Sequence, residues 1–216
     1  MEGRQLKGSY RRPPAAAVDN SQQMAGFLLV AEPRLHFLRR LEGAVTIMST
    51  TARQHREEAP AKIRCAVITV SDTRTLETDT GGKTLIDRLV AAGHEVAVRE
   101  IVPDEPTSIA ALLLEYRDRA DLDAVLLTGG TGISRRDQTY ETVASLLTKA
   151  LPGYGELFRM LSYQEIGPAA MLSRAIGGLL GSKVVLTMPG SPAAVALAMD
   201  QVILPELGHL VREARK

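Results

Sequence analysis

Residues 123–139 read Asp-Ala-Val-Leu-Leu-Thr-Gly-Gly-Thr-Gly-Ile-Ser-Arg-Arg-Asp-Gln-Thr. The run at 125–127 is apolar and branched, which is typical of a buried strand. The glycines that follow let the backbone turn sharply and approach a ligand, and the N–H groups and hydroxyls of such a loop can form a nest for phosphate. A helical pattern begins near residue 139. The order of strand, glycine turn, charged triplet and helix predicts an anion-binding loop of an α/β protein.

The alternative interpretation of this stretch is a tight loop with solvated charges, because short glycine patterns are weak evidence on their own. Either Arg135 or Arg136 could balance charge on a phosphate, and either could equally be a solvated surface arginine. The candidate ligand groups of this loop are Thr128, Gly129, Gly130, Thr131, Gly132, Arg136 and Asp137.

The composition is that of an ordinary soluble globular protein of 216 residues, with 45% hydrophobic and 24% charged residues. The net charge of +1 and the scarcity of aromatic residues give no indication of nucleic-acid binding. No uninterrupted apolar run approaches the roughly 20 residues of a membrane span. The single cysteine, Cys65, lies in an apolar strand pattern and is expected to be a buried structural thiol rather than a nucleophile. These features suit the cytoplasm.

Residues 1–60 differ from the rest of the chain. Polar, proline and alanine clusters without sustained periodicity predict a disordered or spurious N-terminal extension. We expect the functional protein to start at Met48, and the alternative is a regulatory tail. Residues 61–216 are expected to form one α/β domain.

Strands and helices alternate from residue 63 onward, which predicts a mostly parallel sheet with helices on both faces. The expected strands cover residues 63–70, 95–102, 125–127 and 183–188, the second as an edge strand. The expected helices cover residues 80–93, capped by Asp79 or Thr80, and residues 108–119, 140–149, 157–161, 168–175 and 193–210, the last with a kink expected at Pro205.

Four loops follow the carboxyl ends of these strands and should therefore meet at one edge of the sheet. They carry Ser71 and Asp72, then Asp104, then the glycine loop, and finally Pro189, Gly190 and Ser191. These loops supply hydroxyls, glycine N–H groups, arginines and carboxylates, which are groups that bind phosphate and metal ions. No Ser-His-Asp set, cysteine nucleophile or histidine metal spacing accompanies them. For Asp104 the alternative is a helix-capping role.

Nine ordered motifs together resemble the MoaB/MogA family of molybdenum cofactor biosynthesis proteins, over roughly residues 62–210. The motifs are Val70-Ser71-Asp72, Gly93-His94, Pro103-Asp104, the loop 128–132, Arg136-Asp137, residues 152–156, residues 158–162, Leu172-Ser173-Arg174 and residues 188–191. The Phe-Arg-Met-Leu-Ser phrase at 158–162 resembles the MoaB branch in particular.

The resemblance implies a molybdopterin-binding three-layer α/β/α domain. In active family members this domain transfers AMP from ATP to the terminal phosphate of molybdopterin and releases pyrophosphate. The two aspartates of active members match Asp104 and Asp137, which are thus expected to be catalytic and to bind Mg²⁺. The resemblance also implies a trimer or hexamer, and a molybdenum-insertion protein of the same pathway is a candidate partner.

The chemistry of the residues agrees with that expectation. Adenylyl transfer moves charge among phosphates, so catalysis depends on positioning and electrostatic stabilisation. Carboxylates are ligands for Mg²⁺, glycine-loop amides would hold the triphosphate, and the loops at Ser71 and 189–192 would hold the pterin or its phosphate. Two other hypotheses stay open: a non-catalytic molybdopterin-binding or scaffold protein, and an unrelated nucleotide-binding domain.

Overall fold

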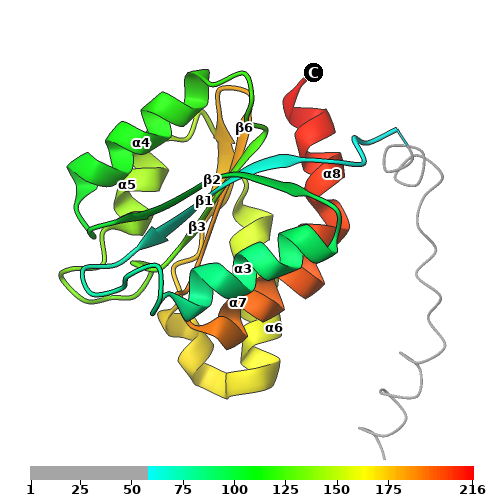
Figure 1. Ribbon diagram of the computed structural model, residues 1–216. Coiled ribbons are helices and arrows are strands. Elements are labelled where there is room, and N and C mark those ends of the chain that lie inside the picture. The colour runs from blue at the N-terminus through cyan, green and yellow to red at the C-terminus, as the bar shows by residue number, and fades with distance from the viewer. Residues whose placement is uncertain (1–57) are drawn as a thin grey trace, which may run out of the picture. The chain divides into compact units, whose positions relative to one another are not determined.

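A computed structural model describes residues 58–216, and the expectations for residues 1–57, including the start at Met48, lie outside it. The described chain is a three-layer α/β/α sandwich (Figure 1), which confirms the expected fold class. The strands are β1 Arg64–Val70, β2 Glu95–Val102, β3 Ala124–Thr128, β4 Lys149–Ala150, β5 Gly177–Leu180 and β6 Lys183–Met188. The helices are α3 Thr80–Ala91, α4 Pro106–Asp118, α5 Thr139–Leu146, α6 Pro152–Ile166, the 3₁₀ segment η1 Gly167–Leu172, α7 Pro192–Ala198, the π turn η2 Met199–Ile203 and α8 Leu204–Ala214.

The six strands form one sheet in the order β2-β1-β3-β6-β5-β4. β2, β1, β3 and β6 are parallel, whereas β5 and β4 are antiparallel to their neighbours. The four expected strands are therefore confirmed, and β2 lies at an edge as predicted. The antiparallel pair was missed, because β5 is a four-residue Gly-Gly-Leu-Leu segment that lacks a strand pattern long enough to recognise.

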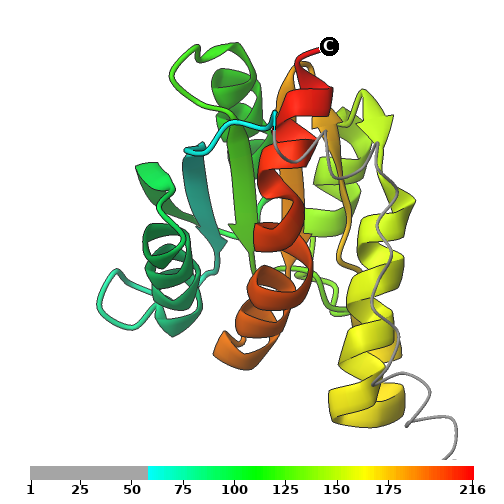
Figure 2. The same cartoon turned by 90° about the vertical axis from the view of Figure 1, so that its right-hand side faces the viewer.

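β1, β3 and β6 direct alternate side chains into two apolar cores on opposite faces of the sheet. Cys65, Val67 and Leu126 pack under α3, α6, α7 and α8, while Ile68 and Leu127 pack under α4 and α5. Figures 1 and 2 show these two helix groups on opposite faces of the sheet. The thiol of Cys65 is fully buried, and burial raises its pKa to about 12, so it is a structural thiol as predicted.

Three helix expectations need correction. The helix predicted at 140–149 ends at Leu146, because Lys149–Ala150 pairs with β5. The helix expected at 157–161 is longer at both ends, because α6 begins at Pro152 and runs on to Ile166; Pro152 suits the first helical position, where its missing N–H is not needed. The predicted helix at 168–175 is the shorter 3₁₀ segment η1.

The C-terminal helix expected from 193 runs from α7 through η2 to α8. The kink was expected at Pro205; the structure has a π turn at Met199–Ile203, which ends two residues earlier, and Pro205 itself lies in the first turn of α8. By length and composition alone, residues 192–214 could also cross a membrane. Their apolar side instead lies in the core, where Val195, Ile203 and Leu207 are buried.

Candidate functional site

The loops that follow the four parallel strands meet at one edge of the sheet. Ser71 N donates to Val102 O at 2.8 Å, and Gly129 N donates to Met188 O at 3.0 Å. Thr128 Oγ1 donates to Pro189 O at 3.0 Å. The expectation that these loops share an edge is therefore confirmed. The Thr128 hydroxyl, however, is fully buried and donates its hydrogen to a neighbouring loop.

The glycine loop owes its shape to two residues with positive φ, Gly129 at +100° and Gly130 at +62°. A Cβ on Gly129 would lie 2.2 Å from Val70 O. A Cβ on Gly130 would lie 2.2 Å from Thr139 Oγ1 and 2.6 Å from Asp104 Oδ2. Neighbouring protein groups thus approach so closely that only glycine fits at these two positions, whether or not a ligand is bound. The sequence pattern did not reveal this packing.

Two cavities open at this edge and share Gly190 and Ser191. The first has a volume of about 330 Å³, and the second about 340 Å³. The first is lined on its polar side by Thr131, Gly132 and Asp137 and on its apolar side by Phe158, Ile166 and Leu172. The second is lined by Ser71, Arg74, Asp79, Thr128 and Gly129. We call them the Asp137 cavity and the Arg74 cavity.

Asp104 lies at the carboxyl end of β2 with 6% of its surface exposed, and it lines neither cavity. Its Oδ1 accepts a hydrogen bond from Gln138 N at 2.9 Å, and its own N donates to Asp72 Oδ1 at 3.1 Å. Burial raises the pKa of Asp104, the Gln138 N–H opposes this, and the negative charges of Asp137 and Asp72 add to it. The capping alternative is wrong for the helix that follows, because the N-cap of α4 is Glu105. The carboxylate instead ties the β2 loop to the start of α5.

Asp137 faces the Asp137 cavity and also shapes its own loop. Its Oδ2 accepts a hydrogen bond from Ser134 N at 2.7 Å. The same oxygen would lie 2.8 Å from a Cβ on Gly132. The position of this carboxylate is therefore coupled to the backbone of the glycine loop.

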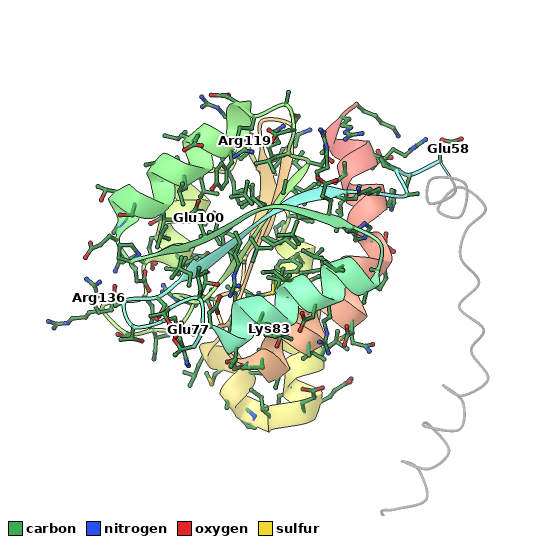
Figure 3. The ribbon with its side chains drawn as sticks, in the orientation of Figure 1. Glu58, Glu77, Lys83, Glu100, Arg119 and Arg136 are labelled. Atoms are coloured by element: carbon green, nitrogen blue, oxygen red, sulfur yellow. The ribbon has the colours of Figure 1, made fainter. Side chains whose placement is uncertain are left out.

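Asp72 and Arg136 lie in a surface ion cluster and line neither cavity. Arg136 Nη2 lies 2.7 Å from Asp72 Oδ2, and its Nη1 lies 2.7 Å from Glu105 Oε1. The hydrogen bond from Arg136 lowers the pKa of Asp72, and the hydrogen bonds to Glu105 and Asp72 raise the pKa of Arg136. Figure 3 labels Arg136 at this edge. The cluster connects the β1, β2 and β3 loops.

Sequence reasoning did not include Arg74 among the candidate site residues. The one hydrogen bond of its guanidinium in the described chain goes from Nη1 to Thr78 O at 3.0 Å, and no carboxylate pairs with it there. Its place three residues after Ser71, in a loop already assigned to the site, was a signal that could have identified it.

Asp79 was interpreted as a helix cap, and this prediction is confirmed because its Oδ1 accepts from Gly82 N at 2.8 Å. The structure adds that Asp79 lies on the wall of the Arg74 cavity, where Thr69 Oγ1 donates to its Oδ2 at 2.8 Å and Arg99 Nη2 lies 3.2 Å away. Phe158 and Ser162 line the Asp137 cavity one helical turn apart on α6, a spacing that the short predicted helix concealed.

In residues 58–216 no group of three or more His, Cys, Asp or Glu side chains could hold a metal ion. Asp104 and Asp137 remain as a pair of carboxylates from adjacent loops. Mg²⁺ is commonly bound by one or two carboxylates together with water and substrate phosphate oxygens, so a pair fits this ion better than a metal that needs an all-protein site. The buried Thr139 hydroxyl beside Asp104 has no hydrogen-bond partner in the described chain.

A protein-family model described as "Probable molybdopterin binding domain" matches residues 66–209. Molybdenum cofactor biosynthesis protein B of Halalkalibacterium halodurans is 52% identical over 167 residues, which cover 77% of this chain and 98% of that protein. The protein of the same name from Bacillus subtilis has the same identity and coverage.

Solved structures of proteins with related names are also similar to this chain. A crystal structure of a molybdenum cofactor biosynthesis protein B has a TM-score of 0.71 and 54% identity, covering 73% of this chain and 99% of that one. The molybdopterin biosynthesis enzyme MoaB from Thermus thermophilus has a TM-score of 0.64 and 36% identity, covering 70% of this chain and 96% of that one. The residues 66–209 that the family model matches include those that line both cavities.

Proposed function

Because the chain belongs to the MoaB/MogA family of molybdenum cofactor biosynthesis proteins, we propose that it binds molybdopterin at the loop edge and transfers AMP to it from ATP. The observation that carries the proposal is the pair of cavities that adjoin at Gly190 and Ser191. Two adjoining cavities of similar volume suit a reaction that joins two substrates. Asp137 on one wall and Arg74 on the other supply charged groups of opposite sign.

In the proposed reaction, an oxygen of the terminal phosphate of molybdopterin attacks the α-phosphorus of ATP. A phosphorus–oxygen bond forms there, the bond to the β-phosphate bridging oxygen breaks, and pyrophosphate leaves. Ser71, Thr131 and Ser191 line the cavities, and their hydroxyls would donate hydrogen bonds to phosphate oxygens. Arg74 would balance the negative charge of the phosphates. Positioning and electrostatic stabilisation of this kind account for most of the catalysis of phosphoryl-type transfers.

Asp104 and Asp137 would hold Mg²⁺ against the phosphates of ATP. When bound, this ion neutralises phosphate charge and orients the oxygens for displacement. The electrostatics of Asp104 support this role, because burial and two neighbouring carboxylates raise its pKa and a cation would relieve that unfavourable field.

The test is pyrophosphate release in the presence of Mg²⁺, ATP and molybdopterin, with a control that omits molybdopterin. Asp137→Asn keeps the shape of the side chain and its acceptor for Ser134 N but removes the charge. We expect this variant to fold and to release pyrophosphate about 10²–10³ times more slowly. Equal rates in both proteins would contradict the role of Asp137.

The second candidate function is molybdopterin binding without catalysis. It is favoured by one observation: Asp104, already hydrogen-bonded to Gln138 N, lines neither cavity. Molybdopterin binding by fluorescence, combined with no pyrophosphate release from the wild type, would establish this function instead.

We also propose that the protein acts in the cytoplasm as a trimer or hexamer, where a molybdenum-insertion protein is a candidate partner. Six apolar side chains on α6 and η1 are about half exposed or more in the single chain, and such surfaces commonly mark interfaces. They are Leu157, Met160, Tyr163, Ile166, Met171 and Leu172. Sedimentation at micromolar concentration should give a trimer or hexamer, and a monomer would contradict the proposal.

A further inference from the structure

Arg174 donates hydrogen bonds to three backbone carbonyls between residues 131 and 137. Its N donates to Thr131 O at 3.1 Å, its Nε donates to Gly132 O at 2.7 Å, and its Nη2 donates to Asp137 O at 3.0 Å. Within residues 58–216, no other residue from outside the loop 129–138 donates a hydrogen bond to the backbone carbonyls of 131–137. The loop that carries Asp137 is therefore anchored from a segment about 40 positions later in the sequence.

The remaining contacts of Arg174 indicate that it anchors the loop and does not bind substrate. Its Nη1 is paired with the carboxylate of Glu141, and its guanidinium lies 5.3 Å from the centre of the Tyr140 ring. Three quarters of the side chain is buried, with 26% exposed. With its charge balanced and its donors committed to protein groups, Arg174 is poorly suited to bind a phosphate directly.

Resting on the function proposed above, we propose that Arg174 is the positioning residue that sets the place of the Asp137 carboxylate. Asp137 Oδ2 is packed against Gly132 and accepts from Ser134 N, so a shift of the Gly132 or Asp137 carbonyl moves the carboxylate as well. The planar guanidinium can meet two separated carbonyls and a carboxylate at once. A lysine ammonium at the end of a flexible chain keeps the charge but cannot hold this arrangement.

The experiment compares wild type with Arg174→Met and Arg174→Lys, and uses Arg159→Met as the matched control. Arg159 is also half-buried and donates to a single carbonyl, Ala175 O at 3.3 Å, without contacting the glycine loop. The first readout, which needs no substrate, is hydrogen–deuterium exchange of the amides in 129–139. We expect exchange there to become at least about tenfold faster in both Arg174 variants, with β1 and β3 unchanged and Arg159→Met like wild type.

The second readout is the Mg²⁺ dependence of pyrophosphate release. Loss of a group that orients a metal ligand typically costs about 10- to 100-fold in metal affinity or activity. We therefore expect the half-saturating Mg²⁺ concentration to rise about tenfold in both Arg174 variants. Added guanidinium ions should restore part of the rate in Arg174→Met and leave the rate of Arg159→Met unchanged.

Several results would overturn the inference: unchanged loop exchange in Arg174→Met, faster exchange throughout the domain, an equal effect of Arg159→Met, or wild-type behaviour of Arg174→Lys. If Arg174→Met does not fold, Arg174→Lys decides the same question. A wild type that releases no pyrophosphate would refute the proposed function, while loop exchange would still decide whether Arg174 is the anchor.

Discussion

Two carboxylates at opposite ends of the parallel strands are equally buried but differ in their arginine contacts and in the direction of their pKa shifts. Asp104, at the carboxyl end of β2, is 6% exposed, and Asp123, just before the amino end of β3, is 5% exposed. Asp123 accepts hydrogen bonds from Arg64 and Arg215; burial alone would raise its pKa, but these arginines outweigh burial and lower the pKa to about 2. Asp104 has no arginine of the described chain in direct contact, and its pKa is raised. A buried carboxylate left without a cation is typical of a functional site, whereas a paired one serves stability.

The largest expected difference between the two ends is in catalysis. If the proposed function holds, Asp104→Asn should lower the rate of pyrophosphate release by about 10²–10³, because it removes one of the two carboxylates that would hold Mg²⁺. Asp123→Asn should leave the rate within about twofold of wild type at a temperature where both variants are folded. Steady-state assays at saturating Mg²⁺ measure this. A similar loss in both variants would mean that the two ends do not differ in function.

Glycine substitution should reveal the same contrast in stability. Gly130 at the loop edge and Gly93 just before β2 both have positive φ, but a Cβ on Gly93 meets nothing within 4 Å. Gly93→Ala should therefore cost only the backbone strain, about 1 kcal/mol. Gly130→Ala adds a clash with Thr139 and Asp104 and should cost about 3 kcal/mol. Urea denaturation of both variants checks the difference, and equal costs would contradict the close packing of the loop edge.

At the amino end, Asp123→Asn should lower the free energy of unfolding by about 2 kcal/mol at pH 7, since hydrogen bonds from two arginines to a charged acceptor are weakened. Because the folded pKa of Asp123 is depressed, its stabilising contribution is present above the unfolded pKa near 4. It is lost as the pH falls toward about 2. Melting curves of wild type and variant should therefore converge between about pH 4 and pH 2, and a constant difference would exclude this ion network as the cause.

The smallest expected effect is a gain in stability, from Asp104→Asn, whereas Asp123→Asn lowers stability. Since the pKa of Asp104 is raised in the folded protein, its ionisation opposes folding as the pH rises above the unfolded value near 4. Asp104→Asn should therefore melt slightly above wild type at pH 7, and the difference should vanish as the pH falls to about 4. The amide oxygen still accepts from Gln138 N, which makes Asn the suitable replacement. A lower melting temperature at pH 7 would mean that the charge of Asp104 stabilises the fold.

The fold was predictable where local sequence and tertiary environment agree. The strands β1, β3 and β6 are buried on both faces, and their continuous apolar runs show this directly. Lys149–Ala150 could not be recognised, because its two exposed residues form a strand only through pairing with β5. The shared loop edge was also predictable, because the parallel order of the strands brings Ser71, Thr128 and Pro189 to it.

The apolar periodicity, the glycine turn and the acidic residues could all be identified in the sequence, because they depend on local geometry and residue chemistry. Three-dimensional contacts were needed to show that Asp137 lines a cavity while Asp104 lies behind the glycine loop, and that Asp72 pairs with Arg136. It also brought Arg174 to the loop 131–137. Such contacts join residues tens of positions apart in the sequence. The pKa of a carboxylate depends on its burial and on the charges that the fold brings near it. Asp104 and Asp123 therefore have opposite pKa shifts, although both are aspartates at the end of a regular strand.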